Sequence, residues 1–202
     1  MLLLEGALPS QIDNAIEAFG LNMGPFRMMD LIGLDLGWRA RKLAGVDSPL
    51  TNKIADTLCE NERFGQKNSK GFYNYSEGSR APNPAPENEE IYFKISEENG
   101  FTRREISDEE IVDRCILALV NEGAKILEEG VAQRASDMDI VYINGYGFPV
   151  WRGGPMFYAN SLGLDKVLEK LKGFQEIDSD FWKPADLLVK LAKDELKFGE
   201  AP

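Results

Sequence analysis

The chain has 202 residues, of which 43% are hydrophobic and 28% are charged, so it can bury a sizeable core and is not a disordered protein. It contains no histidine, which excludes a Ser-His-Asp triad, a Cys-His pair, a histidine general base and any zinc site that uses histidine. Its 23 basic and 34 acidic residues give a net charge of −11, which argues against a nucleic-acid groove.

Residues 1–11 do not look like a signal peptide, because they lack a basic segment before the apolar residues. No apolar run in the chain reaches the roughly 18 residues that a membrane span needs. The two cysteines, Cys59 and Cys115, form no CxxC motif. We interpret both as small buried hydrophobic residues in a reducing compartment.

Proline and glycine mark the elements of the first 75 residues. Pro25 suits the first turn of a helix, where a missing N–H costs nothing. The sequence Asp47-Ser48-Pro49 predicts the start of a second helix that runs to about Glu60. The aromatic alternation of residues 72–75 is the only strand signal, and it is short.

A break in composition follows at residues 76–90. Pro82, Pro84 and Pro86 oppose helix formation and favour an extended segment. We therefore expect a first unit of residues 1–75, a proline-rich linker of residues 76–90 and a second unit of residues 91–202.

The strongest helix prediction covers residues 106–130. Ser107 and Glu110 have the spacing of a capping box. Gly123 lies on the apolar face and indicates close approach of another helix. That face is formed by Val112, Ile116, Leu119, Val120 and Leu127. A last helix is expected after Lys183-Pro184, with Leu187, Leu188 and Leu191 facing inward.

The chain also contains an internal repeat. Residues 4–7 with Asp13 recur 124 positions later as residues 128–131 with Asp137. The pattern Gly-Pro, seven residues, Gly-Leu-Asp at residues 24–35 recurs 130 positions later at residues 154–165. The difference of six residues predicts an insertion around residues 147–152 of the second copy.

Four segments carry a family resemblance: LLLEGALPSQIDNAI, NMGPFRMMDLIGLD, RFGQKNSKGFYNY and the run from Ile106 to Asn160. They resemble the C-terminal domain of L-3-hydroxyacyl-CoA dehydrogenase, in two tandem copies as at the end of the multifunctional fatty-acid β-oxidation enzyme, which also carries an enoyl-CoA hydratase. The third segment has Asn68-Ser69 where the family usually has Thr-Gly. The resemblance implies an all-α fold of two helical repeats packed around a pseudo-two-fold axis.

The resemblance also implies where the chemistry lies. In the family, 3-hydroxyacyl-CoA is oxidised to 3-ketoacyl-CoA with NAD between a Rossmann domain and this helical region, and the catalytic histidine belongs to the Rossmann domain. This chain has no histidine, and Gly145-Tyr146-Gly147 lacks the third glycine of a dinucleotide fingerprint because Val150 stands there. We therefore expect no catalytic residue, cofactor or metal site in this chain, and no activity from it alone.

The resemblance places Met23, Gly24, Pro25 and Phe26 beside the acyl cleft, where a helix N-terminus also offers free N–H groups. The alternative is a plain helix start with Met23 and Phe26 in the core. We expect the second copy's Gly154-Pro155-Met156 to lie away from any cleft, because an insertion carrying Trp151 and Arg152 would block it.

Other candidate residues have a functional and a structural interpretation. Arg63, Lys67 and Lys70 could meet CoA phosphates or form a solvated face. Arg152 could bind an anion, but pairing with an acid is favoured. Asp137 and Asp139, like Asp35 and Asp165, are best explained as helix caps.

Two rival functions remain open: a purely structural module without substrate contact, and an acyl-CoA-binding protein that acts alone. Expected partners are a Rossmann NAD-binding domain of the parent chain and an acyl-CoA substrate at the shared cleft, with no nucleic acid and no membrane span. The expected location is cytoplasmic, as in bacteria, or peroxisomal. Family members with one copy dimerise through it, so a chain with two copies is expected to be a monomer.

Overall fold

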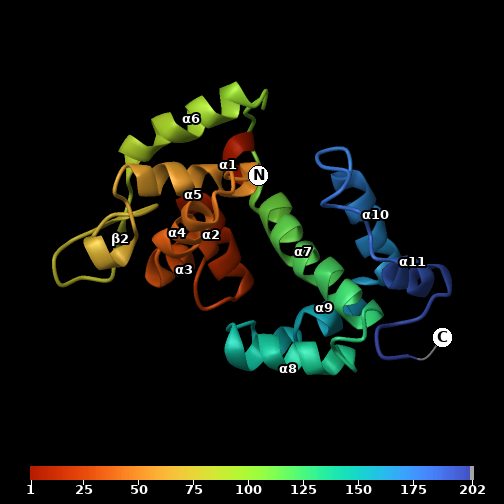
Figure 1. Cartoon of the computed structure of the whole chain (residues 1–202). Helices are drawn as coiled ribbons and strands as arrows, with labels where there is room; N and C mark the ends of the chain where they lie inside the picture. The colour runs from red at the N-terminus through yellow and green to blue at the C-terminus, as the bar shows by residue number, and fades with distance from the viewer. Residues whose placement is uncertain (201–202) are drawn as a thin grey trace. The chain divides into compact units, whose positions relative to one another are not determined.

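The computed structural model describes residues 1–200 and is built almost wholly of helices (Figure 1). The α-helices are α1 (Leu2–Glu5), α2 (Pro9–Phe19), α3 (Pro25–Ile32), α4 (Asp35–Ala44), α5 (Leu50–Glu60), α6 (Glu89–Glu98), α7 (Asp108–Glu128), α8 (Ala135–Gly145), α9 (Pro155–Leu162), α10 (Leu164–Phe174) and α11 (Asp186–Lys193). Single 3-10 turns occur at η1 (Gln66–Asn68), η2 (Pro86–Asn88) and η3 (Val150–Arg152). Within residues 1–200 the only strands, β1 (Asn74–Tyr75) and β2 (Pro82–Asn83), form one antiparallel pair. The predicted all-α fold class is confirmed.

The chain divides into two compact units. Unit 1 contains residues 1–17 and 23–108, and unit 2 contains residues 18–22 and the described residues from 109 onward. Residues 76–108, which the sequence suggested as a linker and the start of a second unit, therefore belong to unit 1. The end of α2, in turn, contributes Phe19 to unit 2.

Hydrogen bonds explain why residues 76–108 join unit 1. Asn88, which is buried, donates to the carbonyl oxygens of Gly71 (3.0 Å) and Phe72 (3.2 Å). Further along, Ser96 Oγ donates to the carbonyl of Leu4 at 2.6 Å, and the N–H of Arg104 donates to the carbonyl of Glu5 at 2.8 Å. Because buried backbone groups need partners, these bonds fix α6 and the segment after it on the first unit.

Helix α6 was not predicted, since its polar start follows the three prolines. Those prolines do not form one extended stretch. Pro82 lies in β2, and Pro86 begins the 3-10 turn η2, which leads directly into α6. Proline is tolerated there because the N–H groups in the first turn of a helix have no acceptor within the helix, so a residue without an N–H loses no hydrogen bond.

The repeat is clear in the helices themselves. Helices α2 and α8 have 11 residues each and start 126 positions apart, at Pro9 and Ala135. Helices α3 and α9 have eight residues each and start 130 positions apart, at Pro25 and Pro155. The second α–α connection is thus longer by four residues, not six.

The predicted helix of residues 106–130 is confirmed as α7, and the expected close approach at Gly123 is real. A methyl group on Gly123 would come within 2.7 Å of the sulfur of Met156. In unit 2, α7 contributes Leu117 and Val120, both fully buried, to a core that also contains Met156, Val167, Leu171 and Leu188. Leu117 was not part of the predicted apolar face, whereas the predicted Val112 and Leu119 are partly buried and pack against a second cluster. Phe19, Ile116 and Phe148 form a second cluster in unit 2.

Other helix predictions were close. Helix α5 begins at Leu50, one residue after Pro49, and without a side-chain cap. Helix α11 buries Leu188 and Leu191, with Leu187 partly buried beside them.

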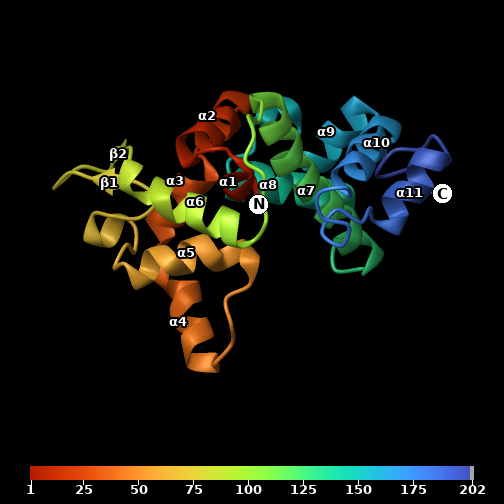
Figure 2. The ribbon, with the colours of Figure 1, turned by 90° about the horizontal axis from the view of Figure 1, so that it is seen from above.

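Helix α4 projects from the body of unit 1 and returns to α5 through residues 45–49 (Figure 2). Its side chains Leu36 and Leu43 are exposed. In residues 1–200, no helix combines the length and the hydropathy that crossing a bilayer demands.

Candidate functional site at the start of helix α3

The four candidate residues Met23, Gly24, Pro25 and Phe26 form the turn into α3. Gly24 is the N-cap residue and Pro25 follows at the first helical position. Gly24 is buried, whereas Met23, Pro25 and Phe26 are half-buried and so keep surface available for a ligand. We call these four residues the α3 turn.

Asp13 on helix α2 caps the α3 turn. Its two carboxylate oxygens accept the N–H groups of Phe26 at 2.9 Å and Arg27 at 3.0 Å. Gly24 lies directly on Asp13, and a methyl group there would overlap the Cα and Cβ atoms of Asp13. Two of the helix N–H groups expected to be free are therefore occupied, so this helix N-terminus is not an open anion site.

Residues 72 and 73 contact Asp13 and the α3 turn. The hydroxyl of Tyr73 donates to Asp13 Oδ2 at 2.6 Å. The ring of Phe72 meets the ring of Phe26 edge-on, with centroids 4.6 Å apart. Phe26 is thus held by a hydrogen bond at its backbone and by a ring contact at its side chain.

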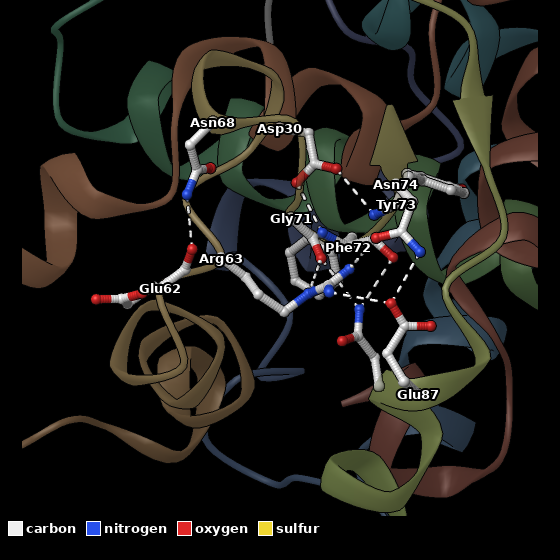
Figure 3. A network of polar contacts seen from close by, with 10 residues as sticks. Asp30, Glu62, Arg63, Asn68, Gly71, Phe72, Tyr73, Asn74 and Glu87 are labelled. Carbon is white, nitrogen blue, oxygen red and sulfur yellow. Dashed lines mark hydrogen bonds and ion pairs between the residues drawn. The ribbon is translucent and has the colours of Figure 1, made fainter. Parts of the chain in front are cut away.

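A second buried carboxylate, Asp30, holds residues 72–75 against the middle of α3. Asp30 has 0% exposure and accepts the N–H groups of Phe72 (2.9 Å) and Tyr73 (3.0 Å), as Figure 3 shows. It also accepts the hydroxyl of Tyr75 at 2.9 Å. The sequence analysis did not identify this network. Its one signal was an aspartate between Met29 and Leu31, a residue type that is seldom fully buried unless it is paired.

Burial dominates the electrostatics of this network. It raises the pKa of Asp13 and of Asp30 above their ordinary values, although the hydrogen bonds that each carboxylate accepts act in the opposite direction. Burial, and then the hydrogen bond to Asp13, raise the pKa of Tyr73. Tyr73 therefore stays protonated at physiological pH and acts as a hydrogen-bond donor.

The three basic residues of the loop after α5 do not form a phosphate cluster. Arg63 is buried and donates to Gly71 O (2.8 Å), to Asn74 (2.8 Å) and to Glu87 (3.1 Å), as Figure 3 shows. Lys67 pairs with Asp35, and this contact lowers the pKa of the aspartate. Of these three residues, only Lys70 has no side-chain partner within residues 1–200, so the structural interpretation of this loop is favoured.

The start of α9 in unit 2 has the same design. Asp139 accepts the N–H groups of Met156 (2.8 Å) and Phe157 (3.2 Å), so Asp139, not Asp137, is the counterpart of Asp13. Asp137 instead pairs with Arg134 at 2.8 Å. Met156, the counterpart of Phe26, has 0% exposure.

Comparison with known proteins gives the family. The model of the 3-hydroxyacyl-CoA dehydrogenase C-terminal domain matches residues 1–75 and 111–201, one match for each repeat. The chain belongs to this family. A peroxisomal bifunctional enzyme of Danio rerio is 42% identical over 94% of the chain, and the α subunit of the fatty acid oxidation complex of Shewanella frigidimarina is 34% identical over 98%.

A solved structure supports the same assignment. The dehydrogenase part of multifunctional enzyme 1 from C. elegans matches 92% of the chain and 42% of its own length, with a TM-score of 0.73 and 31% identity. The chain spans only 29% of the Danio rerio protein and 28% of the Shewanella protein.

The two copies of the 3-hydroxyacyl-CoA dehydrogenase C-terminal domain differ at the position of Asp30. The counterpart in the second copy is Asn160, whose amide oxygen accepts the N–H of Phe198 (2.9 Å) and whose NH2 group donates to the carbonyl of the same residue (3.1 Å). An uncharged residue with one donor and one acceptor is sufficient in the second copy, whereas the first copy uses an acceptor of three hydrogen bonds.

Arg152 has a structural role that differs from the expected ion pair. Its Nε donates to the carbonyl of Phe19 at 3.0 Å, and its guanidinium carbon lies 3.9 Å from the centroid of the Phe19 ring. The rings of Trp151 and Tyr158 also face it, at 4.1 and 5.3 Å. In the described part of the chain Arg152 has no acidic partner, so it acts as a cation among aromatic rings.

The environment of Cys59 does not favour a reactive thiolate. Cys59 is buried, and burial raises the pKa of its thiol to about 12. Cys115 is half-buried rather than fully buried, and neither cysteine forms a disulfide.

Proposed function

We propose that this chain supplies the C-terminal helical region of an NAD-dependent 3-hydroxyacyl-CoA dehydrogenase of fatty-acid β-oxidation, and that its α3 turn completes the acyl-substrate cleft. The parent reaction oxidises a 3-hydroxyacyl-CoA to the 3-ketoacyl-CoA. The relatives named above are a bifunctional enzyme and a subunit of a fatty acid oxidation complex, which supports a place in a multifunctional enzyme. The Danio rerio relative is named as peroxisomal and the Shewanella relative is bacterial, which fits a peroxisomal location or the cytoplasmic one expected for a bacterial enzyme.

One difference between the two copies carries the proposal. The first copy leaves Pro25 and Phe26 half-exposed, whereas the second copy buries the equivalent Pro155 and Met156. Both helix starts are capped in the same way by an aspartate, so the fold itself does not require Phe26 to be exposed. Exposed aromatic surface on a rigid helix start suits an apolar acyl group, and Phe26 has no proton to transfer.

The partner in this proposal is an NAD-binding domain, which would dock on α3 and α4 of unit 1. Leu31, Ile32 and Leu36 are 46%, 60% and 60% exposed. At the positions of Leu31 and Leu36 the second copy has Ser161 and Lys166, which are polar residues typical of a solvent-exposed surface. Exposed apolar residues that a sister copy replaces with polar ones indicate a face that a partner covers.

NAD and the reacting groups belong to the partner domain in this proposal. The chain has no histidine to act as general base, and the α3 turn holds no titratable side chain. The residues present fit apolar contact with the acyl portion of the substrate, not nicotinamide chemistry. The rival function, a structural module without substrate contact, predicts that truncating Phe26 changes stability alone.

The 202-residue chain should not catalyse the reaction by itself, because it lacks a histidine and a dinucleotide fingerprint. We expect NAD reduction with 3-hydroxybutyryl-CoA to equal that of a heat-denatured sample. The same assay with the longer protein provides the positive control. Reduction clearly above the denatured sample would refute this part of the proposal.

Phe26→Ala in the longer enzyme should lower kcat/KM for acyl-CoA substrates about tenfold to a hundredfold, since loss of a buried aromatic contact costs roughly 1–3 kcal/mol. The matched control is Phe157→Ala, which removes an exposed phenylalanine one position beyond Met156, the counterpart of Phe26. Phe157→Ala should leave kcat/KM unchanged. Full activity of a folded Phe26→Ala enzyme across chain lengths would favour the structural module.

A further inference from the structure

We propose that Tyr73 is a positioning residue for the reaction: through Asp13 it fixes the α3 turn in the orientation that the acyl group meets. This inference rests on the proposed function of the α3 turn. It adds a residue 47 positions away from Phe26 that touches no substrate itself. The steps of the argument are the contacts of Asp13, the anchoring of Tyr73 and the comparison with the second copy.

Asp13 joins Tyr73 to the α3 turn. The carboxylate has 1% exposure, and its three partners are the hydroxyl of Tyr73 and the N–H groups of Phe26 and Arg27. The Tyr73 hydroxyl and the Arg27 N–H share Oδ2, so the tyrosine sets the rotation of the carboxylate that caps the helix. Hydrogen bonds to a charged acceptor in a buried site are the strong ones, and this bond is short at 2.6 Å.

Tyr73 can position Asp13 only because its own backbone is fixed. Asp30 accepts the N–H groups of Phe72 and Tyr73, and it lies on α3, five residues after Pro25. The same dipeptide is therefore tied to the middle of α3 through its backbone and to the start of α3 through the Tyr73 hydroxyl. The edge-on contact between Phe72 and Phe26 closes this arrangement. Movement of the α3 turn would have to break at least one of these contacts.

The second copy serves as an internal comparison. Asp139 caps α9 through Met156 and Phe157, but in residues 1–200 no tyrosine hydroxyl donates to it. A helix start that is packed in the core needs no further support. The start of α3 is half-exposed, so packing alone fixes it less well, and the hydroxyl of Tyr73 supports its capping aspartate.

Tyr75, two residues after Tyr73, provides a matched control. Its hydroxyl also donates to a buried aspartate, Asp30, at 2.9 Å. Asp30 keeps two backbone N–H donors when this hydroxyl is removed, and none of them belongs to the α3 turn. Tyr73→Phe and Tyr75→Phe thus delete the same chemical group from positions two residues apart, and only the first should loosen the α3 turn.

The first measurement is amide hydrogen exchange on the 202-residue chain. Tyr73→Phe should speed exchange at the N–H groups of Phe26 and Arg27 about tenfold, because both donate to a carboxylate that has lost its fixed rotation. Tyr75→Phe should leave both rates unchanged. Equal rates at these two amides in Tyr73→Phe and the unmodified chain would overturn the inference, whatever the substrate role of the α3 turn.

The second measurement is steady-state kinetics on the longer enzyme. A contact made equally in the ground and transition states changes KM and not kcat. Tyr73→Phe should therefore raise KM for the acyl-CoA about threefold to tenfold with kcat nearly constant, and Tyr75→Phe should lower Tm without changing KM. Asp13→Asn should reproduce the rise in KM.

The variants distinguish failure of the inference about Tyr73 from failure of the proposed function of the α3 turn. If Phe26→Ala impairs the enzyme while Tyr73→Phe leaves KM unchanged, Tyr73 has a structural role only and the inference is wrong while the proposed function stands. If Phe26→Ala has no effect, the proposed function fails and the inference fails with it.

Discussion

Gly24→Ala should destabilise unit 1 by more than about 3 kcal/mol, a cost in the range of severe overpacking. The added methyl group would overlap the Cα, Cβ and Cγ atoms of Asp13. Two of these atoms cannot move without displacing helix α2, and Asp13 cannot withdraw without uncapping Phe26 and Arg27. The α3 turn and the fold of unit 1 therefore depend on the same glycine.

The measurement is the free energy of unfolding from urea denaturation, with the Tm as a second readout. Gly145→Ala is the control, because Gly145 ends α8 and a methyl group there meets open space. It should be neutral or stabilise by up to about 1 kcal/mol. A Gly24→Ala chain as stable as the Gly145→Ala chain would show that α2 and α3 can separate freely.

The sequence could predict Gly24 as a helix start but not as a close contact. Gly-Pro before an apolar run is a local signal, and it correctly located both α3 and α9. The contact with Asp13 depends on how α2 folds back, which no local pattern records. For the same reason the repeat was found, but Asp13 was matched to Asp137 instead of Asp139. The two copies are matched correctly by the 126 positions between the starts of α2 and α8, and not by identical residues in the two sequences.

Long periodic helices were predictable and short polar ones were not. Helix α7 has 21 residues with a sustained apolar face, so its bounds were predicted to within two residues. Helix α6 begins with Glu89 and Glu90 behind three prolines, and its place in unit 1 depends on hydrogen bonds to residues near position 4. Hydrogen bonds between residues more than 90 positions apart cannot be predicted from the local composition of either segment.

The basic loop residues and Arg152 show a further limit of sequence reasoning. Both sites could be read as places where a cation meets an anion. The structure instead turns Arg63 inward to carbonyl and amide oxygens and surrounds Arg152 with aromatic rings. A sequence gives the charge of a side chain, but the packing around it decides whether that charge faces a ligand.

Asp30→Ala should cost about 3–5 kcal/mol of unfolding free energy, since it leaves two buried N–H groups and one buried hydroxyl without an acceptor. Each unsatisfied group loses its hydrogen bond and remains out of water, and Gly71 packs on the same carboxylate. Residues 72–75 should detach from α3. Asp137→Ala, which removes a solvent-facing pair with Arg134, is the control and should change stability little.

Asp30→Asn distinguishes loss of charge from loss of acceptors. The second copy shows that an amide works where one N–H and one carbonyl must be satisfied, as Asn160 does with Phe198. In the first copy, Phe72 and Tyr73 each donate an N–H to a different oxygen of Asp30. In Asp30→Asn, the NH2 group would replace one of these oxygens and would face an N–H donor. We therefore expect Asp30→Asn to lie between the unmodified chain and Asp30→Ala in urea midpoint. An Asp30→Asn chain with the same urea midpoint as the unmodified chain would mean that one of the two N–H groups, of Phe72 or Tyr73, finds another acceptor. Asp30 would then not be the residue that fixes Tyr73 near the α3 turn.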